Sequence, residues 1–181
     1  MLDCLSIIQR YYTPGNDDYR VLVLHSRQVA DLAVALGQRL IDRHTPLDIE
    51  FVEEAAMLHD IGIFRCDAPG IQCFGTEPYI RHGIIGAEIL RQEGWERHAL
   101  VCERHTGTGL SKWDIEQQQL PLPHKEFMPI SLEEQVVCYA DKFYSKTRPG
   151  SERSVVEAMR SLEKFGWDGV RRFHKWVDLF E

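Results

Sequence analysis

The sequence lacks a long apolar run. No stretch of its 181 residues approaches the roughly 18 consecutive apolar residues that a membrane-spanning helix requires. The first residues, MLDCLSIIQRYY, carry an acid early and have neither a basic start nor a small-residue cleavage site. We therefore expect no signal peptide, no membrane partner and a cytoplasmic location.

Cysteine and basic residues are also limited. The five cysteines are an odd number without a CxxC pair, which argues against a disulfide framework or a zinc ribbon. The 21 Lys and Arg residues are outnumbered by 28 Asp and Glu, giving a net charge of −7. Stable nucleic-acid binding calls for a basic face, so we do not expect it, although a local basic pocket is compatible with this charge.

Repeats and convincing strand patterns are missing, whereas helical patterns dominate. Apolar residues spaced by threes and fours predict a long helix over 18–44, and shorter helices are expected at 2–12, 82–93, 96–105, 152–165 and 168–180. Asp48 suits the start of a helix that Gly62 ends, and Ser131 with Glu134 forms a capping box for another. Glycines and prolines predict loops over 64–80 and 106–130.

These elements predict an all-α protein. At 181 residues the chain is long enough for one well-buried domain and short for two. We expect a single-domain helical bundle with a core over about residues 20–148 and C-terminal helices within 152–180 packed on it. The sequence carries no signal for an oligomeric state.

Several metal-binding residue types fall in apolar, helix-like surroundings. His59 and Asp60 lie in MLHDIG at the end of an apolar helix, where an acid and an imidazole are costly to bury without partners. Two more histidines follow at equal spacing, and a second aspartate lies in CYADK. The candidate set is His25, His59, Asp60, His82, His105 and Asp141. The other histidines, which fit no pattern and are expected at the surface or at helix caps, are His44, His98, His124 and His174.

This mixture of side chains suits catalytic metal. Imidazole binds transition metals, carboxylates can bridge two ions, and the lack of thiolates argues against a closed structural zinc site. Four neutral imidazoles and two carboxylates carry about −2, so two divalent ions would leave a site of about +2 that attracts phosphate. We expect iron or manganese, with zinc, nickel, cobalt or magnesium as alternatives.

In this order the six residues resemble the HD superfamily, in its variant with two extra histidines and a dinuclear centre. Residues 59–62 match the HDIG signature letter for letter. The segments RHGIIGAEILRQEG, ERHTGTGLS and EEQVVCYADKFYSK resemble small HDIG proteins of bacteria and archaea, so that the resemblance covers about residues 20–148. It implies an HD-type helical bundle with metal-dependent phosphohydrolase activity.

The resemblance also implies a role for each matching residue. His25, His59 and Asp141 would hold one metal ion, His82 and His105 the other, and Asp60 would bridge both. Hydroxide between the ions would attack phosphorus in line. Cyclic-di-GMP phosphodiesterases of the superfamily carry a lysine soon after HD and a GYP motif, and Ile63-Phe64-Arg65 follows here without GYP. This departure argues against a cyclic-dinucleotide substrate.

Basic residues near the ligand segments are candidates for binding substrate phosphate. Lys142 and Arg81 each adjoin a ligand, and Arg104 and Lys146 lie close to one in sequence. Solvated surface positions are the alternative for each. We assign catalytic roles to Asp60, His82, His105 and Lys142, and substrate contacts to Arg81, Lys142, Arg104 and Lys146.

Three functions are compatible with this sequence. The first is a metal-dependent phosphohydrolase that cleaves a phosphate ester or anhydride of a nucleotide or similar small molecule. The second is an HD-type di-iron oxygenase, which would use the same ligands to activate O₂. The third is a binding module without catalytic turnover, but the complete set of metal ligands argues against it. We favour the phosphohydrolase because positive charge beside the ligands suits an anionic ester.

Overall fold

A computed structural model describes residues 2–181 and has the expected helical architecture. The part that it describes contains the α-helices α1 Cys4–Ile8, α2 Asp17–Asp42, α3 Ile49–Leu58, α4 His82–Gln92, α5 Glu96–Arg104, α6 Lys112–Gln117, α7 Leu132–Asp141, α8 Val155–Leu162 and α9 Trp167–Phe180. None of these helices combines the length and the apolarity that crossing a bilayer would require. The prediction of an all-α domain is confirmed.

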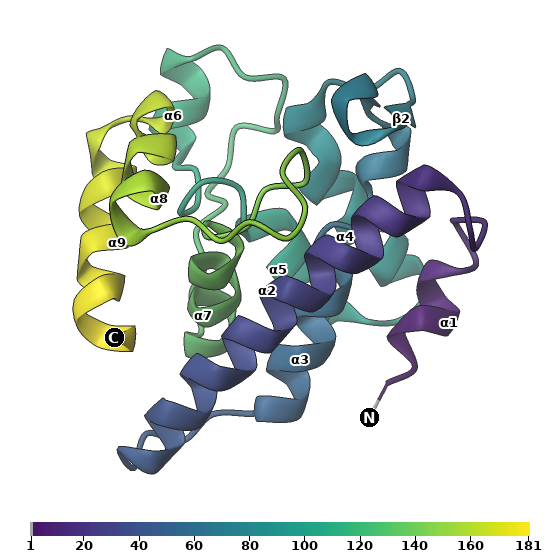
Figure 1. Cartoon of the computed structure of the whole chain (residues 1–181). Helices are drawn as coiled ribbons and strands as arrows, with labels where there is room; N and C mark the ends of the chain where they lie inside the picture. Colours follow the sequence, from purple (N-terminus) through teal and green to yellow (C-terminus); the bar gives the residue numbers. More distant parts are fainter. Residues whose placement is uncertain (1) are drawn as a thin grey trace.

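The long helix α2 is the centre of the bundle. It packs against α3 and α7, and its buried side includes Leu22, Val29, Leu36 and Leu40. Figure 1 shows α2 crossing the molecule, with α3 and α7 beside it and α4 and α5 behind. The apolar periodicity of the sequence therefore marks the face of α2 that is turned to the other helices.

The helix starts predicted at Asp48 and Ser131 are confirmed, whereas two predicted helix ends are wrong: the helix expected over 2–12 ends at Ile8, and the one expected to end at Gly62 stops earlier. The Asp48 side chain accepts a hydrogen bond from the Phe51 amide, and Ser131 and Glu134 form a reciprocal capping box. The helix α3 ends at Leu58, before Gly62, whose φ of −83° is not the left-handed value of a glycine cap. A side chain on Gly62 would meet the His82 carbonyl, so this glycine allows close packing on α4.

Both predicted loops contain regular structure that the sequence analysis missed. Within 64–80, β1 Asp67–Ala68 pairs antiparallel with β2 Cys73–Phe74, in the register Asp67↔Phe74 and Ala68↔Cys73. Two-residue strands are too short to show alternation. The 3₁₀ turns η1 Ile63–Arg65, η2 Pro69–Ile71 and η3 Tyr79–Arg81 complete this segment. Within 106–130, α6 begins at a capping box of Ser111 and Asp114, a signal that was present in the sequence.

The C-terminal helices cover one side of the core. After the turn η4 Glu163–Phe165, α9 packs on α7 and places Phe173 and Phe180 around the fully buried ring of Tyr139. The ring centroids lie 4.9 and 5.1 Å from that of Tyr139. Residues of α8 and α9 thus belong to the same core cluster as α2, α3 and α7. All five cysteines are free and buried.

The close approach of α4 and α5 gives a stability prediction. A Cβ atom on Gly83 would lie 2.4 Å from the Cys102 carbonyl oxygen, so one helix would have to shift. We expect Gly83→Ala to lower the free energy of unfolding by about 1–3 kcal/mol in chemical denaturation. Gly70→Ala is the control, because nothing lies within 4 Å of its added Cβ. Equal stability of the two variants would contradict the packing described.

Candidate metal centre

Three helices bring together the first group of potential ligands. His25 lies in α2, His59 directly follows α3, and Asp141 is the last residue of α7. The Nε2 atom of His25 is 3.0 Å from Asp141 Oδ1 and 3.2 Å from Asp60 Oδ2. The Nε2 atom of His59 is 3.4 and 3.0 Å from the same two oxygens. These four side chains form one cluster capable of holding a metal ion.

The second cluster comes from the α4–α5 pair. His82 is the first residue of α4 and His105 directly follows α5. Gly94, with φ of +85°, lies in the turn between the helices, which brings the beginning of α4 beside the end of α5. The two Nε2 atoms are 3.0 Å apart, so the convergence expected from the sequence is observed.

Asp60 belongs to both clusters. Its Oδ2 faces His25 and His59, while its Oδ1 is 3.4 Å from Nε2 of His82 and 3.4 Å from Nε2 of His105. The carboxylate is completely buried. Two His/Asp clusters that share one carboxylate suggest a dinuclear metal site.

The backbone fixes which ring nitrogens can bind a cation. The Nδ1 atoms of His59, His82 and His105 lie 2.6, 2.6 and 2.8 Å from the carbonyl oxygens of Ala56, Tyr79 and Cys102. A carbonyl only accepts hydrogen bonds, so each Nδ1 is assigned the donating proton. Each Nε2 of the neutral rings therefore turns a lone pair into the cluster, as metal ligation requires.

Unsatisfied buried atoms support this interpretation. Nε2 of His59 and both carboxylate oxygens of Asp60 are buried without a hydrogen bond of acceptable geometry. Lone pairs of His59 and Asp60 face each other, an arrangement that is costly unless a proton or a cation lies between them. The donor set of neutral imidazoles and carboxylates fits divalent ions well.

The electrostatics of the two clusters differ. Burial and the neighbouring His105 lower the pKa of His82 to about 3, despite the opposing effect of Asp60. Burial lowers the pKa of His105 as well. For His59, burial would lower the pKa, but the carboxylates of Asp60 and Asp141 outweigh it and raise the pKa to about 9. Neutral imidazoles are thus favoured at the second cluster, and the acids are concentrated at the first.

Two lysines lie against the carboxylates. Lys142 is buried, and its Nζ donates to Asp141 Oδ2 at 2.6 Å and to the His105 carbonyl at 3.0 Å, which links the two clusters. The ammonium of Lys146 pairs with Asp60. Burial would raise the pKa of Asp60, but Lys146 and His59 hold it well below its usual range. The substrate contacts expected of both lysines and the catalytic role expected of Lys142 stay predictions, and in this structure each ammonium contacts an acid of the centre.

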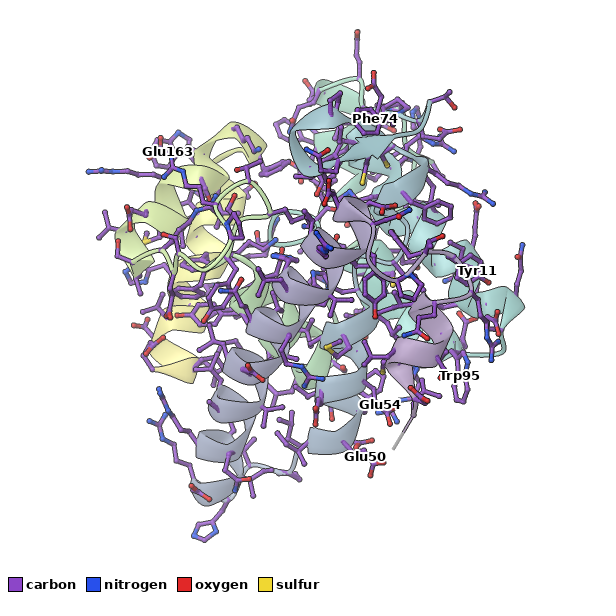
Figure 2. All side chains as sticks on the ribbon, turned by 45° about the vertical axis from the view of Figure 1, so that its right-hand side comes forward. Tyr11, Glu50, Glu54, Phe74, Trp95 and Glu163 are labelled. Carbon is purple, nitrogen blue, oxygen red and sulfur yellow. The ribbon has the colours of Figure 1, made fainter. Side chains whose placement is uncertain are left out.

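A pocket of about 420 Å³ opens over the second cluster. One side comes from the segment before α4, with Ala68, Gly70, Ile71 and Tyr79, and the other from η4 and the residues around it. In Figure 2 the labels Phe74 and Glu163, which are not lining residues themselves, locate β2 and η4 beside these two segments. The residues of the centre that line the pocket are His82, His105, Asp141, Lys142 and Lys146.

The other residues singled out in the sequence lie elsewhere. Arg81 pairs with Glu77 and donates to the Pro121 carbonyl, and Arg104 pairs with Glu134. Neither arginine lines the pocket, so their contact with substrate stays a prediction. His98, expected at the surface, is buried beside Glu54, with its Nε2 3.2 Å from the carboxylate. Its apolar neighbours Phe51 and Trp95 explain the difference.

Two pocket cations were missed. Arg153 and Lys164 line the pocket, yet both follow the last ligand by a dozen residues or more. Only the packing of α8 and η4 against the rest of the fold brings them there. The sequence alone held no signal that could have singled them out.

Comparison with known proteins decides the family. Residues 22–145 match the family model described as the HD domain. The chain belongs to the HD domain family. An uncharacterized protein of Methanocaldococcus jannaschii is 37% identical over 128 residues, which cover 70% of this HD domain chain and 68% of that protein.

Two further relatives are longer proteins. They are named tRNA (cytidine(56)-2′-O)-methyltransferase, from Thermoplasma volcanium and Picrophilus torridus, and are 33% and 32% identical. The matches cover 96% and 76% of this HD domain chain but only 45% and 38% of the relatives. The chain thus spans less than half the length of these methyltransferases.

Solved structures support the same fold. The HD domain of the L. monocytogenes phosphodiesterase PgpH superimposes with a TM-score of 0.54 at 18% identity, over 99% of this chain and 87% of that one. The same domain in complex with cyclic-di-AMP gives a TM-score of 0.55, again at 18% identity, over 99% and 86%. At this identity the likeness establishes the fold.

The shared carboxylate gives a prediction about metal content. Because Asp60 faces all four histidines, Asp60→Ala should remove both ions, and metal analysis of anaerobically purified protein should give well below one ion per chain. His174→Ala is the matched control, since this exposed histidine lies on α9 beside Asp178. About one full ion per chain in the Asp60 variant would show that the carboxylate serves a single metal.

Proposed function

We propose that this HD domain protein is a metal-dependent phosphohydrolase that cleaves a phosphate ester or anhydride of a nucleotide or similar small molecule. The observation that carries the proposal is the position of the shared carboxylate cluster at the base of a pocket lined by several cations. HD domains are typically metal-dependent phosphohydrolases, and the ligand set of that chemistry is complete in this chain.

The six residues divide the metal-binding work between them. His25, His59 and Asp141 would hold one ion, His82 and His105 the other, and Asp60 both. Divalent ions held there would supply Lewis acidity towards phosphate oxygens and towards water. Donation from Nδ1 to the backbone fixes the orientation of three imidazoles before any ion binds.

The pocket supports an anionic substrate of small size. Its charged lining consists of Lys142, Lys146, Arg153 and Lys164 against the single carboxylate of Asp141, apart from the two histidines. The cavity of about 420 Å³ lies in the usual range for small-molecule sites. Because Lys142 bonds the carbonyl of His105 and the carboxylate of Asp141, it would position one residue of each cluster.

The relatives support a nucleotide as the substrate class but do not indicate which nucleotide. The PgpH phosphodiesterase domain that shares the fold was solved with cyclic-di-AMP, a molecule in which phosphodiester bonds join two nucleotides. This chain lacks the lysine after HD and the GYP motif of the cyclic-di-GMP enzymes, which argues against a cyclic dinucleotide. The methyltransferase activity of the longer relatives is not transferred, since more than half of each lies outside the match.

The oxygenase alternative leads to an experiment that separates the two reactions. Hydrolysis needs Lewis acidity and water but no redox change, so Mn²⁺-loaded protein should release phosphate from nucleotide esters or anhydrides in an anaerobic chamber. Asp60→Asn, which retains the shape of the bridging side chain without its charge, should lower that release by at least ~100-fold.

A screen over nucleoside monophosphates, diphosphates and cyclic nucleotides makes this test, with release of phosphate, nucleoside or, from a cyclic substrate, the linear nucleotide as the readout. Turnover that requires both iron and O₂, with none under argon, would replace the hydrolase by the oxygenase. In that case the fold and the metal ligands would be unaffected.

A further inference from the structure

Arg153 is held in the pocket wall by the backbone around it. Its amide donates to the Phe143 carbonyl at 2.8 Å, and Tyr144 and Glu152 form an isolated antiparallel bridge in the same place. The short segment before α8 is thereby tied to the residues just after α7. Its Nη1 donates to the Lys142 carbonyl at 3.2 Å, which places the guanidinium one residue from the ligand Asp141.

This guanidinium has more donors than the protein uses. An arginine carries five N–H donors, and the contact with the Lys142 carbonyl is the one side-chain hydrogen bond of Arg153 among residues 2–181. Within that same range no carboxylate forms an ion pair with it, in contrast to Arg81 and Arg104. Glu157 lies near enough for Arg153 to help lower its pKa, but its carboxylate is bound to the cap at Ser154.

Lys164 is the second uncompensated cation. It lies in η4 on the wall of the same pocket, and its Nζ is 4.9 Å from the centroid of the Phe165 ring. No ion pair of Lys164 occurs among the described residues. The inner lysines differ in this respect, because Lys142 pairs with Asp141 and Lys146 with Asp60. The positive charge that remains for a ligand is therefore concentrated at the outer wall.

We propose that Arg153, assisted by Lys164, forms a subsite for a second anionic group, so that the substrate carries another phosphate or carboxylate besides the phosphate at the metal centre. This inference rests on the proposed phosphohydrolase function. It narrows the substrate class to compounds with two anionic groups: a diphosphate, a molecule phosphorylated at two places, or a phosphate ester that also carries a carboxylate. A planar guanidinium with free donors suits two-point contact with such a group.

The test compares ligands with one and two anionic groups on the metal-loaded protein. Isothermal titration calorimetry with propylphosphonate measures the affinity for one anionic group. The same titration with alkane-α,ω-bisphosphonates of one to four carbons shows how much a second anionic group adds to that affinity. We expect at least one bisphosphonate to bind ~10-fold or more tightly than propylphosphonate, the size expected of a charge-assisted hydrogen bond. A preference for the one-carbon compound would indicate that the substrate is a diphosphate. A preference for a longer compound would indicate a substrate with two separate phosphate groups.

The variants show where that preference arises. Arg153→Gln should remove most of the advantage of the bisphosphonate, Lys164→Gln part of it, and Arg153→Lys should restore some of it. Binding of propylphosphonate should stay within about two-fold of the wild type in each variant, because one phosphonate contacts only the metal centre. Arg160→Gln, on the exposed side of α8 and outside the pocket lining, is the matched control.

The outcomes separate this inference from the proposed function. Equal affinity for the two kinds of ligand in the wild type would overturn the subsite, as would an advantage that persists in the double variant Arg153→Gln/Lys164→Gln. Phosphate release could still be observed in either case. Conversely, a bisphosphonate preference lost in Arg153→Gln, without hydrolysis of any ester or anhydride, would leave the subsite standing and remove the hydrolase.

Discussion

The rest of the structure depends on a completely buried carboxylate that faces four imidazoles. Asp60 has no exposed surface, and its two oxygens lack hydrogen bonds of acceptable geometry. An isolated buried carboxylate is strongly unfavourable, so the fold must supply compensating positive charge. Without metal, Lys146 and a protonated His59 are placed to provide it, since the pKa of His59 is raised by the same acid. Asp60 is therefore a buried anion, and the groups that the surrounding helices place around it can hold the cations that compensate its charge.

This constraint explains why the ligands lie at helix ends. The carbonyl oxygens of Ala56, Tyr79 and Cys102, each three residues before a histidine, accept from Nδ1 of His59, His82 and His105. Ala56 and Cys102 lie in the last turn of a helix, where carbonyls have no intrahelical partner, whereas the Tyr79 carbonyl precedes α4 and also accepts from the His82 amide. One short local contact therefore sets both the tautomer and the direction of each ring. His25 lies inside α2, and its Nδ1 has no such partner.

The sequence predicted the centre better than it predicted the pocket. The HDIG run and the apolar segments around the acids point to His59, Asp60 and Asp141. Such side chains are costly to bury without partners, and the local sequence alone indicates that they are buried. The convergence of His82 and His105 follows from a helix pair joined at Gly94, which periodicity also indicates. Arg153 could not be found in this way. Its place depends on tertiary pairing of segments on either side of the loop between α7 and α8.

The sequence pattern did not reveal β1, β2 or α6 for a related reason. Asp67 pairs with Phe74 in strands of two residues each. Strands this short show no alternation of apolar and polar residues, so the sequence pattern could not reveal them. Helix α6 did carry a capping signal at Ser111 and Asp114, but prolines and glycines around it suggested a loop. Local chemistry therefore identified helix starts and costly buried groups, whereas the walls of the pocket required knowledge of which distant segments meet.

The lysines also change the charge expected for the loaded site. From the sequence, two carboxylates and two divalent ions leave about +2. In the structure the ammonium groups of Lys142 and Lys146 pair with those carboxylates, so the protein charges near the ions almost cancel once His59 is neutral for ligation. Two divalent ions would then leave the centre at about +4 if both lysines keep their protons. One phosphate of charge about −2 offsets only half of this. The electrostatics of the inner site and the uncompensated Arg153 at its rim thus favour the same kind of ligand, one that carries more negative charge than a single phosphate.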